Sequence, residues 1–247
     1  MLNKIFNEDC LEGMKRIPDE SIDMILTDLP YGTTQCKWDS IIPFEPLWEQ
    51  YERIIKDNGA IALTASQPFT SALVMSNPNW FRYEWIWDKH IARGMHQAKY
   101  QPMRKHENIC IFSKHYPFNY YPIMVKRDKP VTVKNYRKEG GTVGKYRDNT
   151  KSYTYTHKNP DTIIVGKWEA NKGKIHPTQK PVALFEYLIK TYTNEGETVL
   201  DSCMGSGTTA IACINTNRNY IGFELDEEYY KASLERIRVE TMQKKLF

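Results

Sequence analysis

The sequence lacks the residue patterns of several common kinds of site. Its five cysteines are scattered without a C-x-x-C pair, which argues against a disulfide framework or a zinc site. Its six histidines form no H-x-x-x-H or H-E-x-x-H spacing, so we predict no metal. No apolar run approaches the roughly 18 residues of a membrane span, and the N-terminus shows no secretory pattern. We therefore expect a cytoplasmic protein.

The net positive charge of the chain is small, but positive charge is concentrated in one segment. The net charge is +4, yet residues 115–175 contain 13 Lys and Arg against 5 Asp and Glu, together with 7 of the 16 tyrosines. Cations bind phosphate and aromatic rings stack on bases, so this composition is typical of a nucleic-acid surface. A solvated loop with a lysine-rich face is the alternative interpretation.

Short apolar runs alternate with helical patterns toward both ends of the chain, which predicts an α/β sheet. The expected strands cover residues 4–7, 22–27, 60–64, 83–87, 108–112, 198–200 and 220–223. Amphipathic helices are expected around Trp48 with Gly59 as the stop, after Pro181, and from about Glu227. Prolines and glycines interrupt the segment between His115 and Gly173, where we expect loops and short strands.

A glycine loop lies near the C-terminus. A predicted strand ends in Asp201, the loop at 205–207 follows, a helix opens at Thr208, and a second strand ends at Glu224. Glycines let a ligand approach the backbone at a helix N-terminus, and an acidic residue about 20 positions later can accept hydrogen bonds from ribose. No lysine directly precedes Thr208, which disfavours a triphosphate site. Ala210 stands where a dinucleotide site has its third glycine, so a dinucleotide site is an imperfect match that stays open. The pattern predicts a nucleoside site.

The stretch TDLPYG, residues 27–32, follows the apolar run of a predicted buried strand. A Pro-Tyr-Gly turn with a capping Asp28 is the simplest explanation, because such turns are common. A carboxylate, a proline and a tyrosine at the end of a strand also suit a binding site. The motif alone does not distinguish a turn from a binding site, but other stretches of the sequence do.

Four stretches together resemble one family. They are NEDCLEGMKRIPDESIDMILTDLPYG at 7–32, HPTQKPVAL at 176–184, LDSCMGSGTTAI at 200–211 and GFELDEEYY at 222–230. The chain resembles the S-adenosylmethionine-dependent DNA amino-methyltransferases of the permuted, beta-type adenine-specific class, in which an Asp-Pro-Pro-Tyr-type motif precedes the glycine loop. The resemblance implies a doubly wound, mostly parallel, seven-stranded Rossmann-like sheet, circularly permuted, with an inserted target-recognition region. The implied division is a catalytic half at 1–114, the insert at 115–173 and a cofactor-binding half at 174–247.

The resemblance also assigns residues. The catalytic group would be Asp28, Pro30 and Tyr31, and the cofactor-binding group would be Asp9, Cys10, Asp28, His176, Lys180, Pro181, Asp201, Gly205, Gly207, Thr208 and Glu224. In the family's pattern, Asp201 and the two glycines surround the methionine part of the cofactor, Glu224 holds the ribose, and Asp9 with Cys10 faces the adenine ring. His176, Lys180 and Pro181 would close over the methionine end.

Two departures from the family's pattern occur. Ser202-Cys203 stands where the family often has Pro-Phe, and Leu29 stands where it usually has a second proline. Neither position supplies hydrogen-bonding atoms to the mechanism, so we expect only local effects.

The implied activity is methyl transfer from S-adenosyl-L-methionine to the exocyclic amino group of adenine in double-stranded DNA, after the base is flipped out. Asp28 favours adenine, because the cytosine-specific members usually have Ser there. Methylation of the cytosine amino group or of RNA is the alternative within the fold, and a non-catalytic nucleic-acid-binding module is the alternative outside it. The resemblance associates the chain with restriction-modification and leaves open a homodimer and a cognate restriction enzyme as partners.

Overall fold

The computed structural model describes residues 1–32, 39–134, 137–138, 146–147, 152–165 and 179–244. Its backbone separates into two compact units. One unit combines residues 1–121 with 162–247, and the other covers residues 122–161.

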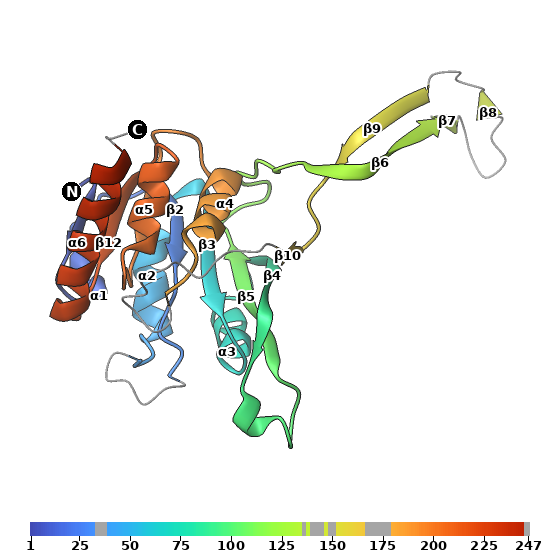
Figure 1. Cartoon of the computed structure of the whole chain (residues 1–247). Helices are drawn as coiled ribbons and strands as arrows, with labels where there is room; N and C mark the ends of the chain where they lie inside the picture. Colours follow the sequence, from blue (N-terminus) through green and yellow to red (C-terminus); the bar gives the residue numbers. More distant parts are fainter. Residues whose placement is uncertain (33–38, 135–136, 139–145, 148–151, 166–178, 245–247) are drawn as a thin grey trace. The chain divides into compact units, whose positions relative to one another are not determined.

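The larger unit is built on an eight-stranded sheet with the order β1-β12-β11-β2-β3-β5-β4-β10 (Figure 1). In that order the strands are Lys4–Phe6, Asn219–Phe223, Thr198–Asp201, Ile22–Thr27, Ile55–Ala65, Arg104–Phe112, Phe81–Arg93 and Ile163–Val165. Every neighbouring pair is parallel except the two pairs that β5 makes with β3 and β4. The predicted mostly parallel α/β sheet is confirmed. It has one strand more than the seven expected, because β10 comes from the predicted insert and pairs with β4.

Helices cover both faces of this sheet. Helices α4 (Val182–Tyr192) and α5 (Thr208–Asn215) share an apolar layer with Met24 and Leu26 of β2, to which α6 (Glu227–Lys244) adds Ile237. Helices α1 (Cys10–Met14), α2 (Phe44–Ile54) and α3 (Phe69–Ser76) pack on the other face with Ile25. A short 3₁₀ turn, η1, covers Met95–Gln97. Among the described residues, no helix has the length and apolarity needed to cross a membrane.

Burial on both faces explains the sequence of β2. All six of its residues, IDMILT, are buried, as is usual for a parallel strand with helices on both sides. Successive side chains of a strand point to opposite faces, so Met24 joins one apolar layer and Ile25 the other. The apolar run that predicted this strand is thus a direct consequence of the layered architecture.

The predicted role of Gly59 is wrong. Helix α2 ends at Ile54, and the chain enters β3 at once, so Gly59 lies inside a strand rather than at a helix end. A Cβ at this glycine would come within 2.9 Å of the Asp23 carbonyl oxygen and 2.7 Å of Ile55 Cγ1. The glycine is needed because β3 passes too close to its neighbours to leave room for a side chain.

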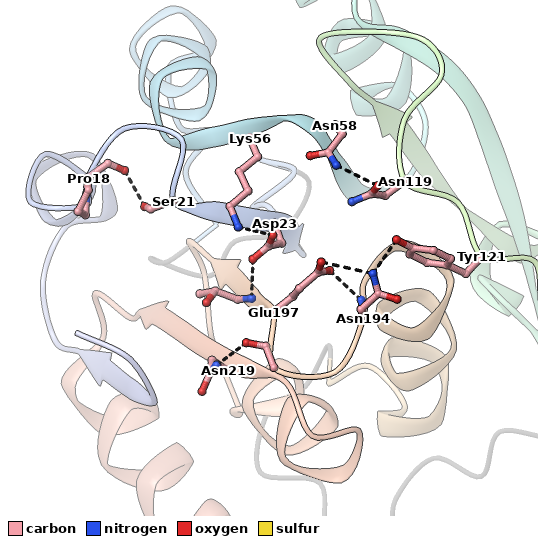
Figure 2. Close-up of polar contacts among 12 residues, drawn as sticks. Pro18, Ser21, Asp23, Lys56, Asn58, Asn119, Tyr121, Asn194, Glu197 and Asn219 are labelled. Carbon is pink, nitrogen blue, oxygen red and sulfur yellow. Dashed lines mark hydrogen bonds and ion pairs between the residues drawn. The ribbon is translucent and has the colours of Figure 1, made fainter.

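A buried carboxylate fixes β2 against the strands on either side of it (Figure 2). Asp23, which is 5% exposed, accepts a hydrogen bond from the backbone N–H of Thr198 in β11 at 2.9 Å. Its other oxygen accepts one from Lys56 Nζ in β3 at 2.6 Å. One side chain therefore ties together the three strands at the centre of the sheet.

A second group of polar contacts anchors residues 119–121 (Figure 2). Asn58 Nδ2 donates to Asn119 Oδ1 at 3.1 Å, and Asn194 Nδ2 donates to the Tyr121 hydroxyl at 2.7 Å. The backbone N–H of Tyr121 also donates to the Thr191 carbonyl at the end of α4 at 2.7 Å. The chain is thus held in the larger unit up to Tyr121, the residue before the smaller unit begins.

The smaller unit is a β-hairpin structure. Strand β6 (Val125–Lys134) pairs antiparallel with β9 (Ser152–Lys158), and β7 (Arg137–Lys138) pairs with β8 (Tyr146–Arg147). Thr132 and Thr154 lie opposite each other, and their hydroxyls are 2.9 Å apart. The neighbouring cross-strand pair, Val131 and Tyr155, is exposed, with 42% and 50% of its surface accessible.

Replacing Asp23 with alanine tests the link between the central strands. The change leaves the buried N–H of Thr198 without its acceptor, so we expect a loss of about 1–3 kcal/mol in the free energy of unfolding. Urea denaturation measures it. Asp57→Ala is the matched control: the Asp57 side chain is 65% exposed and lies 3.5 Å from Lys114 Nζ, so its loss should cost less than about 1 kcal/mol. Equal losses in the two variants would contradict this role for Asp23.

Candidate active site

The candidate site lies where several parallel strands end. Asp28 follows the last residue of β2, Asp201 is the last residue of β11, and Glu224 follows the last residue of β12. Ligands in open α/β sheets bind at this carboxyl edge. All three carboxylates line one pocket, whose walls are Asp28, Pro30, Gln179, Lys180, Phe185, Asp201, Cys203, Met204, Gly205, Ser206, Thr208, Thr209 and Glu224.

Asp28 is held by three side chains. The Tyr31 hydroxyl donates to its Oδ1 at 2.8 Å, the Thr64 hydroxyl donates to the same oxygen, and Lys180 Nζ lies 2.9 Å from the carboxylate. The Tyr31 ring stacks on Phe69, with centroids 5.1 Å apart. Burial and the nearby Asp28 carboxylate raise the pKa of Tyr31, so its hydroxyl keeps its proton and acts as a donor.

The residue between Asp28 and Pro30 faces the other way. Leu29 is 4% exposed and belongs to the apolar layer of α1, α2 and α3, whereas Asp28 and Pro30 line the pocket. This explains how the chain accepts a leucine where the family usually has a proline: the position is filled by core packing.

Lys180 is buried between two carboxylates. Besides Asp28, its Nζ lies 3.1 Å from Glu107 Oε2, and Lys89 Nζ lies 2.8 Å from the other oxygen of Glu107. Burial alone would lower the pKa of Lys180, but the Asp28 carboxylate raises it well above its ordinary value, so the ammonium stays charged. Burial alone would raise the pKa of Glu107, but Lys180 and Lys89 hold it below its usual value.

The two carboxylates at the glycine loop organise the backbone around it. Asp201 accepts hydrogen bonds from the Cys203 N–H at 3.0 Å and from the Thr209 hydroxyl. Burial raises the pKa of Asp201 to about 7. Glu224 accepts from the Gly205 N–H at 2.7 Å and from the Asp226 N–H at 2.9 Å, and burial raises its pKa.

The loop itself requires glycine. Gly205 and Gly207 have φ values of +51° and +77°, which side chains rarely tolerate. A Cβ at Gly207 would also lie 3.2 Å from Ser233 Cβ of α6. Arg236 of the same helix donates to the Ser206 carbonyl at 2.9 Å and to the Thr208 hydroxyl at 3.1 Å. Helix α6 therefore supports the loop from behind.

The other departure from the family's pattern, Ser202-Cys203, is accommodated by a buried polar cluster. The Ser202 hydroxyl lies 2.6 Å from the Tyr51 hydroxyl of α2 and 3.3 Å from that of Thr27, the last residue of β2. Cys203 lines the pocket, and contact with the Cys10 thiol together with burial raises the pKa of the Cys203 thiol. Ser202 thus joins the ends of β2 and β11 behind the carboxylates.

Most of the predicted residues fall into two groups. Those that line the common pocket are Asp28, Pro30, Lys180, Asp201, Gly205, Thr208 and Glu224. Those that support it are Tyr31, Gly207, Cys10 through its contact with Cys203, and Pro181, which precedes α4. Asp9 Oδ1 caps α1 by accepting from the Leu11 and Glu12 N–H groups, so its expected contact with adenine stays a prediction. His176 lies outside the described residues.

Sequence reasoning did not assign several contributors to the site, among them Thr64, Glu107 and Arg236. Glu107 carried a signal, because a charged residue directly precedes the apolar run that predicted β5. Thr64 and Arg236 carried none, since a threonine in a strand and an arginine on a helix are ordinary residues there. The described residues contain no group of three or more His, Cys, Asp and Glu that could hold a metal ion.

Known proteins are similar to this chain in sequence and in fold. The chain is 29% identical over 255 residues to the type II methyltransferase M.HpaI of Haemophilus parainfluenzae, covering 96% of this chain and 74% of that protein. It is 28% identical to M1.MboII of Moraxella bovis, covering 92% and 94%, and 29% identical to the DNA adenine methyltransferase YhdJ of Escherichia coli, covering 95% and 82%.

Two solved structures have the same fold. The M1.HpyAVI–SAM complex aligns with a TM-score of 0.61 at 22% identity over 95% of this chain and 98% of its own. The PvuII DNA methyltransferase, which is cytosine-N4-specific, aligns with a TM-score of 0.67 at 15% identity over 96% and 90%. The model of the N6/N4 methyltransferase family, described as DNA methylase, matches residues 22–235. With this match over most of its length, and with a doubly wound sheet whose motif carboxylates meet in one pocket, the chain belongs to the N6/N4 DNA methylase family.

Proposed function

We propose that the protein transfers a methyl group from S-adenosyl-L-methionine to the exocyclic amino group of adenine in DNA. One observation carries the proposal: Asp28, the carboxylate of the TDLPYG motif, lines the same pocket as the glycine-loop carboxylates Asp201 and Glu224. A cofactor bound at the loop would therefore adjoin the residue that receives the amine. A DNA substrate also agrees with the cytoplasmic location expected from the sequence.

The pocket suits S-adenosyl-L-methionine by its chemistry. The cofactor carries a sulfonium, an ammonium and a carboxylate, so it is a net cation, and Asp28 and Glu224 against Lys180 give the pocket wall a net negative charge. The Gly205 N–H is held by Glu224. A Cβ built on Gly205 would have the Cys203 carbonyl oxygen, at 4.0 Å, as its nearest neighbour, so the space beside this glycine is open to a ligand. Glu224 would hold the ribose and Asp201 the methionine end. When bound, the cofactor supplies an electrophilic methyl group.

The residues of the motif would prepare the amine. The nitrogen lone pair of adenine is delocalised into the ring, so the enzyme has to favour a pyramidal nitrogen. Asp28 accepts one N–H and the Pro30 carbonyl accepts the other, which leaves the lone pair free to attack. Tyr31 offers its ring for stacking on the base. No cysteine nucleophile is needed, and Cys203 is unsuited to the part because its raised pKa keeps the thiol protonated.

The acceptor base is argued from Asp28, because cytosine-specific members of the family usually have serine at this position. The alternatives are the cytosine amino group, an RNA substrate and a non-catalytic module. One measurement separates all of them. The purified protein is incubated with methyl-labelled cofactor and mixed-sequence DNA or RNA, and the nucleic acid is digested to nucleosides. Label in N6-methyl-2′-deoxyadenosine is the expected result.

The smaller unit is proposed to read the target sequence. Residues 122–161 contain ten Lys and Arg against four Asp and Glu, and a two-stranded β-ribbon such as β6–β9 fits the major groove of DNA. A flipped-base pocket contacts one nucleotide, so a longer target needs a second surface. A homodimer and a cognate restriction enzyme stay open as further partners.

Asp28→Ala should abolish methyl transfer with little effect on cofactor binding. The lost hydrogen bond matters most as the nitrogen becomes pyramidal, so we expect kcat to fall by about a hundredfold or more. Single-turnover labelling and cofactor titration measure the two effects. Asp28→Asn keeps the shape of the side chain and controls for folding around Lys180. Activity near that of the wild type in both variants would remove Asp28 from the mechanism.

Glu224→Ala should have the opposite profile. Removing the carboxylate loses the ribose contact and frees the Gly205 N–H, so we expect about tenfold to hundredfold weaker cofactor binding. Calorimetric titration with the cofactor measures this change. Glu228→Ala on the exposed side of α6 is the matched control and should bind normally. Unchanged affinity in the Glu224 variant would show that the ribose lies elsewhere.

Replacing residues 122–161 with a short polar linker should separate DNA recognition from cofactor binding. The cut follows the boundary at Tyr121 and spares β10, so the larger sheet keeps all its strands. We expect normal cofactor affinity and a sharp loss of affinity for the target duplex, because the unit's excess of lysine and arginine is gone. Methylation of the same sites with the same preference would show that specificity lies outside this unit.

A further inference from the structure

Lys180 contacts Asp28 and the Tyr31 ring, the two side chains that the proposed reaction needs for the base. Its ammonium lies 2.9 Å from the Asp28 carboxylate and 5.8 Å from the centroid of the Tyr31 ring, over which it is placed. Its side chain is 7% exposed, so this is a packed position rather than a passing surface contact. In the proposed mechanism Asp28 receives the target amine and Tyr31 stacks on the base. A base entering the site therefore competes with Lys180 for both.

A second carboxylate is already in place to receive Lys180. Glu107 Oε2 lies 3.1 Å from the Lys180 ammonium, so a small rotation of the lysine side chain exchanges one counter-ion for the other. Lys89 holds the opposite oxygen of Glu107 at 2.8 Å and keeps this acceptor fixed. The Glu107 side chain is 16% exposed, which leaves the exchange largely screened from water.

The rest of Lys180 is fixed. Its backbone carbonyl accepts a hydrogen bond from the Thr208 hydroxyl of α5 at 3.3 Å, and Pro181 follows directly. The movement is therefore confined to the side chain. Asp28, Lys180, Glu107 and Lys89 form a row of alternating charges that sums to zero, and moving the ammonium along it leaves no charge without a partner while the amine occupies Asp28.

We propose that Lys180 is a gate on the base pocket and that Glu107 is the positioning residue that opens it. With no base in the site, Lys180 covers Asp28 and the Tyr31 ring. When the base enters, Glu107 takes the ammonium and Asp28 becomes free to accept the amine. This inference rests on the proposed function and adds two residues of β4 and β5, Lys89 and Glu107, to its machinery.

Glu107→Gln tests the gate by removing the alternative counter-ion. Lys180 should then stay on Asp28, so the fraction of protein that can accept a base falls. We expect KM for mixed-sequence unmethylated duplex DNA to rise about tenfold, with kcat changed less than about twofold and cofactor affinity unchanged. Asp88→Asn is the matched control. It removes the same charge from the same pair of strands by breaking the exposed Asp88–Lys105 ion pair, which is 3.0 Å long.

A double variant separates gating from a structural role. In a Lys180→Met background there is no ammonium to move, so adding Glu107→Gln should leave KM unchanged. A merely structural Glu107 would raise KM by the same factor in both backgrounds, and that result would overturn the proposal. If Glu107→Gln does not fold, Lys180→Met alone decides: a KM below that of the wild type supports the gate, and a KM at or above it overturns the gate.

Different results would overturn the proposed methyl transfer and the Lys180 gate. A wild-type protein that labels no nucleic acid would overturn the proposed function and the gate with it. An active wild type in which Glu107→Gln and Asp88→Asn have equal effects would overturn the gate alone.

Discussion

The parallel pairing of β2, β11 and β12 is the constraint on which the site depends. Leu200 of β11 pairs with Ile25 of β2 and with Ile221 of β12. Because parallel strands end at the same edge, this register brings three carboxylates from distant parts of the chain into one pocket. Asp23 at the opposite end of β2 and the Tyr51–Ser202–Thr27 cluster near the pocket fix the same register from both ends of the strands. The acidic pocket is therefore a product of sheet geometry.

Much of the architecture could be predicted because its signals are local. Each predicted strand of the sheet has an apolar run, and the glycine loop and TDLPYG follow such runs directly. Asp9 had a local signal too: an Asp followed three residues later by Glu12 is a helix-start pattern, and the structure uses Asp9 as the cap of α1. The family resemblance implies that Asp9 contacts the cofactor, whereas the helix-start pattern predicts the cap that the structure shows.

What could not be predicted depends on contacts between distant residues. Lys180 and Asp28 are 152 positions apart, and no periodicity links a lysine before Pro181 with a carboxylate after β2. Short strands were expected within residues 115–173, but the pairing of β10 with β4 was not, because three residues carry no signal for the sheet edge that they join. Gly59 was misread because a glycine that ends a helix and a glycine that allows close strand contact look alike in sequence. Only the position of the neighbouring strand distinguishes them, because at Gly59 the Asp23 carbonyl oxygen leaves no room for a side chain.

The position of β11 has a consequence for synthesis of the chain. β2 has β3 on one side and β11 on the other, yet β3 follows it within about 30 residues while β11 begins only at Thr198. A growing chain can therefore pair one edge of β2 early but has to leave the other unpaired until most of the protein has been translated. An open strand edge is a template for aggregation. This edge of β2 therefore stays open until late in synthesis, and the pairing of β11 that closes it also completes the acidic pocket.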